Sequence, residues 1–414
     1  MYLGSQLFIV LVFVVLVLKL YLNQRQATSI TRNVQSVPQR FSAHVSLQEH
    51  SKAAQYNLVQ LSVAQLNVVV AAIVMLFFTL GGGLQMINAY VAHFNFSLSS
   101  PLTQGVLVIG VFSAINALID LPFGIFSTFW IEQKFGFNNT TVKLFILDLF
   151  KGIILSLVIG VPMLYLVLWL MNIMGGLWWL WVWVALVAFN LVLLVVYPTF
   201  IAPLFNKFTP LSDLALKDRI DALLVKCGFK SRGVFVMDGS KRSSHGNAYF
   251  TGIGKSKRIV FFDTVLKQLN IDEIEAVLAH ELGHFKKKHI IKQMVLMFGL
   301  TLIMLFILSL LINQPEFYRS LGVKSSSNYN GLILFSYLLG QIGFLFAPLS
   351  SYFSRKNEFE ADDFAVTHTN REHLISGLIK LYRDNAATLT PDPLYVKFYY
   401  SHPPASIRIQ NLEK

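Results

Sequence analysis

Long runs of apolar residues alternate with polar segments along most of this chain of 414 residues. An α-helix needs about 20 predominantly apolar residues to cross the hydrocarbon core of a bilayer. Seven runs meet or approach this length: residues 7–22, 63–91, 103–131, 153–171, 177–201, 290–312 and 332–353. The pattern therefore predicts a mainly α-helical, polytopic membrane protein with seven transmembrane helices.

Several features modify this simple pattern. The first run has no basic region before it and no clear cleavage site after it, so we interpret it as a retained helix and not as a signal peptide. Three glycines at positions 81–83 divide the second run, and glycine is tolerated in membrane helices. Asp120 lies within the third run, where it either forms an interhelical hydrogen bond or faces a water-filled cavity.

Two polar stretches adjoin these runs. Residues 24–62 contain amphipathic segments but are too polar to span a membrane. Residues 132–151 are amphipathic and charged, and we expect them to lie at the membrane interface.

The segment between the fifth and sixth runs has the composition of a water-soluble domain. Its pattern predicts a helix over residues 211–227, strands over 234–237, 248–252 and 259–262, and then a further helix. We therefore expect a small α+β domain within the membrane protein. The chain then divides into an N-terminal membrane domain (1–202), this domain (203–289), transmembrane helices six and seven (290–353) and a C-terminal segment (354–414) that completes the α+β domain.

Composition and charge agree with a membrane location. Only 14 % of the residues are charged, against about 25 % in soluble proteins, and the net charge is +12. This charge would suit either a nucleic-acid surface or the basic inner loops of a membrane protein. With the amino terminus outside, the inner segments and their edges hold all of the 34 Lys and Arg residues except Arg319 and Lys324. We therefore predict the lipid bilayer, and no nucleic acid, as a partner, and we place residues 203–289 and 354–414 together on the cytoplasmic side.

The sequence His280-Glu281-Leu282-Gly283-His284 has the form H-E-x-x-H. Residues four apart lie on one side of an α-helix, so His280 and His284 can direct their imidazoles at one metal ion. Glu281 follows the first ligand, where its carboxylate can accept a proton from a zinc-activated water. Asn270 and Glu273 are spaced to cap the start of this helix, and Gly283 suggests a close approach by another element.

A catalytic zinc requires a third protein ligand and one open position. On a helix that follows the seventh run, Glu358 and Asp362 share a face, whereas Glu360 points elsewhere. Glu358 is therefore a candidate zinc ligand, and Asp362 can accept a hydrogen bond from a ligand histidine. The alternative is an ordinary acidic helix surface. The single cysteine, Cys227, excludes an internal disulfide and a cysteine-rich zinc site, and is expected to be a small core residue.

Taken together, these motifs resemble the type I CAAX prenyl protease family, which are integral membrane zinc metallopeptidases of the HExxH gluzincin type. The resemblance covers nearly the whole chain and is carried by the H-E-L-G-H motif, by S-R-K-N-E-F-E-A-D from position 354, by S-H-G-N-A-Y-F from position 244 and by S-H-P-P from position 401. It implies seven helices around a water-filled chamber, one Zn²⁺ per chain and a peptide or protein substrate that can be prenylated.

The resemblance also implies roles for individual residues. His280, His284 and Glu358 would bind zinc, and Glu281 would act as the general base. His402 and Arg408 would lie near the zinc, although a loop histidine such as His402 is by itself more often simply exposed. His245 and His289 are not expected to be ligands. An edge strand would hold the substrate backbone by strand addition, and its residues are Asn247, Ala248, Tyr249 and Phe250.

The leading hypothesis is therefore an integral membrane zinc-dependent endopeptidase that acts on lipidated or membrane-associated substrates. The alternatives are a quality-control protease of membrane proteins without a prenyl substrate, and a non-proteolytic zinc-binding membrane scaffold. The polar loop at 314–329 and the C-terminal tail are short, and the last four residues contain no evident retrieval signal. These features favour a bacterial inner membrane over the endoplasmic reticulum, with the active site on the cytoplasmic side.

Overall fold

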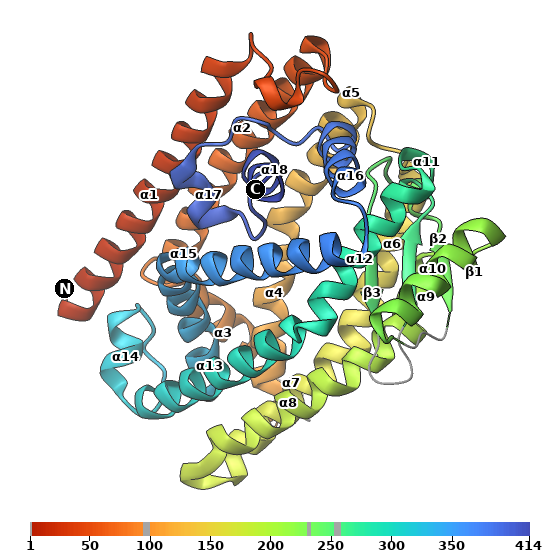
Figure 1. Cartoon of the computed structure of the whole chain (residues 1–414). Coiled ribbons are helices and arrows are strands. Elements are labelled where there is room, and N and C mark those ends of the chain that lie inside the picture. The colour runs from red at the N-terminus through yellow and green to blue at the C-terminus, as the bar shows by residue number, and fades with distance from the viewer. Residues whose placement is uncertain (1, 94–99, 230–232, 252–257) are drawn as a thin grey trace.

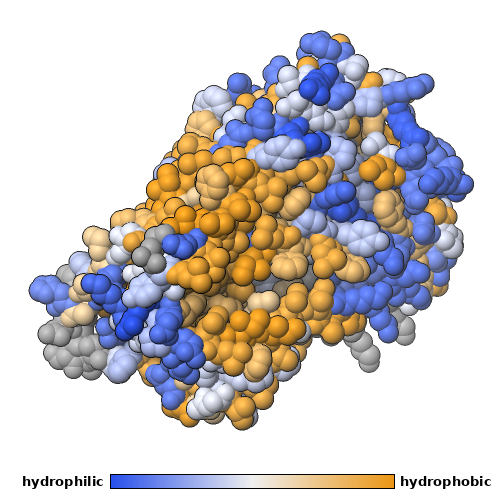
Figure 2. All heavy atoms as spheres, turned by 90° about the vertical axis from the view of Figure 1, so that its left-hand side faces the viewer, coloured by the Kyte–Doolittle hydropathy of each residue, from blue (hydrophilic) through white to orange (hydrophobic). Residues whose placement is uncertain are grey.

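Seven helical segments of the computed structural model are long and apolar enough to cross a membrane. The structure describes residues 2–93, 100–229, 233–251 and 258–414. Within these residues the candidate spans are Leu3–Asn33, Leu47–Phe78, Pro101–Phe135, Val142–Ile173, Gly175–Phe205, His289–Leu311 and Asn328–His368. Figure 2 shows a broad band of hydrophobic atoms across one face, with hydrophilic atoms gathered on both sides of it. The predicted polytopic membrane fold with seven spans is confirmed.

The membrane part contains most of the long helices, which Figure 1 shows around the centre of the molecule. Its helices are α1 (Leu3–Asn33), α2 (Leu47–Phe78), α3 (Gly83–His93), α4 (Pro101–Phe126), α5 (Gln133–Phe135), α6 (Val142–Leu155), α7 (Val161–Ile173), α8 (Trp178–Val196), α9 (Ala202–Phe205), α13 (His289–Leu311), α14 (Pro315–Ser320) and α15 (Asn328–His368). Short π-helical segments continue three of these runs: η2 (Ser127–Glu132), η3 (Ser156–Gly160) and η5 (Tyr197–Ile201).

The remaining elements form the polar part of the molecule. They are β1 (Phe208–Pro210), α10 (Leu214–Cys227), β2 (Val234–Met237), β3 (Ala248–Thr251), β4 (Arg258–Phe262), α11 (Val265–Gln268), α12 (Ile271–Lys286), α16 (Arg371–Asp384), α17 (Pro393–Tyr399) and α18 (Ala405–Leu412). Short 3₁₀ turns occur at η1 (Gln39–Phe41), η4 (Gly175–Leu177) and η6 (Gly239–Lys241).

The structure corrects several predicted boundaries. The polar stretch at 24–62 is largely helical, because α1 continues to Asn33 and α2 begins at Leu47, where Ser46 and Glu49 form a capping box. The second span does not reach residue 91, because α2 ends at Phe78 and a turn with Gly82 at φ +81° separates it from α3. An L side chain rarely adopts such a φ, so glycine stops the helix here.

The segment at 132–151 is also different from its prediction as one interfacial stretch. Thr141 caps α6, and α6, η3 and α7 together form the fourth candidate span, Val142–Ile173. Asp120 is exposed on α4, and its carboxylate makes no hydrogen bond or ion pair with another described residue. Neither alternative for Asp120 gains support from a side-chain contact.

The polar part contains a four-stranded sheet with the order β1-β2-β4-β3. Strand β2 runs parallel to β4, and the two outer pairs are antiparallel. The three predicted strands are present, although position 252, the last of the 248–252 prediction, lies outside the described residues. Strand β1 was not predicted, since three residues are too few to show an alternating pattern. Cys227 is buried in the core between this sheet and the helices, as expected.

Helix α12 carries the H-E-x-x-H motif and packs against α15 (Figure 1). Its predicted capping box is present: the Glu273 amide donates to Asn270 Oδ1, and the Asn270 amide donates to Glu273 Oε2, each over 2.9 Å. A Cβ added to Gly283 would lie 2.9 Å from Ala361 Cα of α15. The expected close approach at Gly283 is therefore confirmed, and the neighbour is the acidic segment itself.

Helix α15 is a single helix of 41 residues. It begins at Asn328, just before the seventh predicted span (332–353), and continues through position 354, where the sequence pattern changes from apolar to polar. The apolar segment and the acidic segment therefore belong to one continuous helix, which contains Pro348, and Glu358 is held by a membrane helix. The division into four domains stays a prediction.

We predict that Gly283→Ala separates α12 from α15. The added methyl group would overlap the backbone of Ala361, which cannot rotate away, so the helices must shift. The expected cost is about 1–3 kcal/mol of stability, together with a loss of metal affinity because Glu358 moves away from the histidines. Thermal unfolding in detergent and zinc titration would measure both effects.

Gly299→Ala is the matched control for this change. Gly299 also lies in a helix, and no atom lies within 4 Å of a Cβ built there. This variant should therefore be at least as stable as the wild type and should bind zinc with the same affinity. Equal stability and equal zinc affinity of the Gly283→Ala protein would contradict the prediction.

Candidate metal centre

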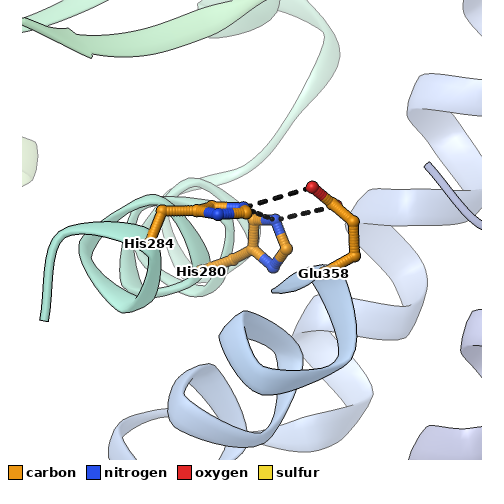
Figure 3. Close-up of side chains that lie close together, drawn as sticks. All are labelled: His280, His284 and Glu358. Carbon is orange, nitrogen blue, oxygen red and sulfur yellow. Dashed lines mark hydrogen bonds and ion pairs between the residues drawn. The ribbon is translucent and has the colours of Figure 1, made fainter. Parts of the chain in front are cut away.

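Three side chains from two helices converge at one point in the polar part of the molecule (Figure 3). His280 and His284 come from α12, and Glu358 comes from α15. The Nε2 atoms of the two histidines lie 3.2 Å apart. Glu358 Oε2 lies 3.4 Å from His280 Nε2, and Glu358 Oε1 lies 3.3 Å from His284 Nε2.

These separations fit a tetrahedral metal ion. Zinc bonds of about 2.0–2.2 Å place donor atoms about 3.3–3.6 Å apart in a tetrahedral site. One ligand atom from each of the three residues can be chosen so that all lie within 4.8 Å of one another. Glu358 is 3 % exposed, and its Oε2 atom accepts no hydrogen bond from a described residue. A buried carboxylate oxygen that faces two imidazole nitrogens is well suited to a cation.

His280 is fixed by a carboxylate on its other side. Its Nδ1 atom lies 2.8 Å from Asp362 Oδ1, so the Nδ1–H donates to Asp362 and Nε2 keeps its lone pair. Arg408 Nε donates to Asp362 Oδ2 over 2.9 Å, and Asp362 is fully buried. The predicted neighbours Asp362 and Arg408 therefore lie together beside one ligand histidine. Arg408 lies closer to Asp362 than to Glu358, from which it is 3.7 Å away.

The surroundings of His280 alter its pKa in the metal-free site. Burial and the charge of Arg408 lower the pKa of His280, but the hydrogen bond to Asp362 and the weaker contact with Glu358 outweigh them and raise the pKa to about 9. At neutral pH the imidazole therefore also carries a second proton, on Nε2, until a metal ion displaces this proton and binds the Nε2 lone pair.

Glu281 follows His280 on α12, and His402 contacts the third ligand, Glu358. The Glu281 side chain is half-buried, and no described residue makes a hydrogen bond or ion pair with its carboxylate. His402 Nε2 lies 3.4 Å from Glu358 Oε1, and the side chain is 63 % exposed. Ser401 Oγ and His402 Nδ1 lie 2.9 Å apart. His402 is thus an exposed side chain beside one of the three ligands.

The predicted substrate strand is an edge strand. β3 pairs only with β4 among the described strands, which leaves its other edge unpaired. Phe250 joins β3 to α12 through its ring contact with Phe285, with centroids 4.3 Å apart. Asn247 precedes the strand, and its carbonyl oxygen accepts from the Phe262 amide over 3.0 Å. Ala248 and Tyr249 complete the predicted set, and both are partly exposed.

The two histidines that were not expected to be ligands lie outside the group of three. His245 Nε2 lies 3.3 Å from Glu132 Oε2, and its Nδ1 lies 3.2 Å from Asn385 Oδ1. His289 lies against the Nδ1 side of His284, at 3.1 Å. No sequence signal indicates the contact between His284 and His289. The two residues lie on different helices on either side of a turn, so helical spacing does not predict that they meet.

Comparison with known proteins shows extensive similarity. Residues 210–414 match the model of peptidase family M48, and residues 26–207 match the model described as "CAAX prenyl protease N-terminal, five membrane helices". The CAAX prenyl protease 1 homolog of Dictyostelium discoideum is 34 % identical over 406 residues, which cover 95 % of this chain and 93 % of that protein. The CAAX prenyl protease 1 of Saccharomyces cerevisiae is 37 % identical over 346 residues, which cover 79 % of this chain and 76 % of that protein.

The fold is also similar to a solved structure. The crystal structure of S. mikatae Ste24p superimposes with a TM-score of 0.92 and 31 % sequence identity. The match covers 100 % of this chain and 99 % of that chain.

We predict that one zinc ion binds per chain and that its affinity falls as the pH decreases. Below about pH 9 a proton on His280 competes with the metal, and zinc must displace this proton to bind. The apparent zinc affinity should therefore fall about tenfold for each pH unit below this value. Titration of metal-free protein with zinc against a competing chelator, from about pH 9 down to pH 6, would measure this. Binding that does not change with pH, or a second tight ion, would contradict the prediction.

Proposed function

The chain belongs to peptidase family M48 with its CAAX prenyl protease N-terminal domain, and from this premise we propose that it is a zinc-dependent endopeptidase. It is an integral, multi-pass membrane protein and a metallopeptidase of the CAAX prenyl protease type. The observation that carries the proposal is the convergence of His280, His284 and Glu358 at one point, with Glu281 next to His280 on the same helix.

The donor set supports zinc as the metal. Two imidazoles and one carboxylate leave a fourth position open, which is typical of catalytic sites, whereas structural zinc sites are usually closed by cysteines. The only cysteine, Cys227, is buried in a separate core cluster. Zinc held by these three ligands would lower the pKa of a water molecule and polarise the carbonyl of the scissile peptide bond.

The residues of the chain would carry the proton. Glu281 takes a proton from the attacking water and later transfers it to the nitrogen of the leaving amine. Its lack of another partner leaves both oxygens available for this task. His402 is exposed enough to reach the substrate carbonyl, and it would stabilise the negative charge that develops on the carbonyl oxygen. Arg408 would act indirectly, since it holds Asp362, which in turn orients His280.

The substrate backbone would bind along β3. An unpaired strand edge offers amide and carbonyl groups to an extended peptide, and Asn247, Ala248, Tyr249 and Phe250 form this edge or precede it directly. Contact between β3 and α12 keeps the edge close to the metal centre. Strand addition would thus place one peptide bond in front of Glu281.

We infer that the substrates include prenylated proteins with a CAAX-type C-terminus. The names of the relatives refer to CAAX prenyl proteases, and the similarity extends over nearly the whole chain. Cleavage would remove the last three residues after the prenylated cysteine. The distribution of Lys and Arg supports an active site on the cytoplasmic side. The type of membrane, the bacterial inner membrane or the endoplasmic reticulum, stays a prediction.

We predict that Glu281→Gln lowers the rate of peptide cleavage by about 10²–10⁴-fold while one zinc remains bound per chain. Glutamine has the shape of glutamate but cannot accept the proton. Glu275→Gln is the matched control, because Glu275 lies on the same helix and pairs with Arg219 at the surface. A Glu281→Gln enzyme with wild-type activity would eliminate the proposed role.

We also predict that a farnesylated CAAX peptide is cleaved at least about tenfold more efficiently than the same peptide without the lipid. Each buried methylene contributes about 0.8 kcal/mol, so even partial burial of the chain exceeds this factor. Mass spectrometry would identify the product that ends at the lipidated cysteine. Equal cleavage of both peptides would favour a quality-control protease, and zinc binding without cleavage of either peptide would favour a scaffold.

A further inference from the structure

His284 makes a contact on the side of its ring that faces away from the metal ligands. Its Nδ1 atom lies 3.1 Å from Nδ1 of His289, with the ring planes at 75°. The other nitrogen of His289, Nε2, lies 3.1 Å from Glu360 Oε2. A continuous series of contacts therefore links Glu360 to His289, His289 to His284, and His284 to the metal site.

The fold builds this series from three elements. His284 belongs to α12, His289 is the first residue of α13, and Glu360 belongs to α15. Lys288, between the first two helices, has φ +58°, a conformation that L residues rarely adopt. This turn separates α12 from α13, and His289, which follows it directly, is 1 % exposed. Strained backbone of this kind persists where the surrounding structure requires it, often at functional sites.

The hydrogen-bond chemistry allows one consistent arrangement of protons. The carboxylate of Glu360 only accepts, so His289 Nε2 must carry the hydrogen between them. In a neutral imidazole the second nitrogen is then an acceptor, so His289 Nδ1 accepts from His284 Nδ1–H. His284 Nε2 is left with its lone pair, and this is the atom that faces His280 and Glu358.

We propose that His289 is a positioning residue which, together with Glu360, fixes the orientation of His284 and keeps the lone pair on its Nε2 directed at the metal. This inference rests on the proposed function only in that a metal binds at the three ligands. His289 is not itself a ligand, because its near nitrogen faces the side of the His284 ring turned away from Glu358. The arrangement parallels the support of His280 by Asp362, so α15 supplies a ligand and an orienting carboxylate for each histidine.

The test compares two substitutions at position 289. His289→Leu removes the acceptor and fills the space, whereas His289→Asn places an amide oxygen near the position of Nδ1. Zinc affinity, measured with a competing chelator at fixed pH, should fall about 10–100-fold in the leucine variant. The asparagine variant should retain most of the affinity. The thermal unfolding temperatures of the two metal-free variants should be alike.

A third substitution leaves the buried core unchanged. Glu360 is 34 % exposed, so the Glu360→Ala protein should fold normally. Without the carboxylate, His289 can carry its proton on either nitrogen, and zinc binding should weaken. The absorption spectrum of the cobalt-substituted protein should also change, since the basicity of a ligand changes. Asp363→Ala is the matched control, because Asp363 is an exposed acid on the same helix and its carboxylate has no partner among the described residues.

The outcomes separate this inference from the function on which it rests. Wild-type zinc affinity in His289→Leu, or equal losses in His289→Leu and His289→Asn, would overturn the positioning role. The second result would show that His289 matters only for packing. Failure of the wild-type protein to bind zinc at all would overturn the proposed function and the inference with it. Loss in His289→Leu and in Glu360→Ala, with retention in His289→Asn, is the result that we expect.

Discussion

The backbone of α12 at Gly283 lies directly against the backbone of α15 at Ala361, and this contact sets the distance between the two sources of metal ligands. A side chain larger than hydrogen at Gly283 would hold the helices apart, and Glu358 would then no longer meet His280 and His284. The glycine has a cost in helix propensity of about 1 kcal/mol against alanine. The close approach explains why this cost is borne in the middle of a helix that is otherwise well capped.

This contact also concentrates charge in a buried space. Glu358, Asp362 and Arg408 are each at most 5 % exposed, and His280 is nearly as deeply buried. Isolated buried charges are strongly destabilising, so each must have a partner. Arg408 and His280 satisfy Asp362, whereas Glu358 Oε2 retains no hydrogen bond within the described chain. Glu358 Oε2 is therefore the atom of this network that needs a cation as its partner. Binding of a metal ion should for this reason stabilise the centre.

The sequence predicted the helices and side chains of this centre more accurately than the residues at which the helices end. The seven spans, the capping box at Asn270 and Glu273, and the meeting of His280, His284 and Glu358 followed from hydropathy, helical spacing and the location of charges. The ends of helices were less accurate, because polar residues such as those at 24–33 extend a helix beyond the membrane without any apolar signal. The contact between His289 and His284 depends on the left-handed turn at Lys288, and no local pattern specifies such a turn for lysine. Strand β1 is too short for any pattern to appear.

The length of α15 has a mechanical consequence. The 41 residues from Asn328 to His368 form one continuous helix whose two arms lie in different surroundings, and Pro348, where a helix can kink, joins the arms. One arm adapts its tilt to the thickness of the hydrocarbon layer, and the other carries Glu358. A change in lipid chain length would thus shift the tilt of the first arm, and the continuous helix, which rises about 1.5 Å per residue, would pass part of this shift to Glu358. A metal ligand must stay within a few tenths of an ångström of its place. The thickness of the bilayer would in this way affect the position of one metal ligand, Glu358.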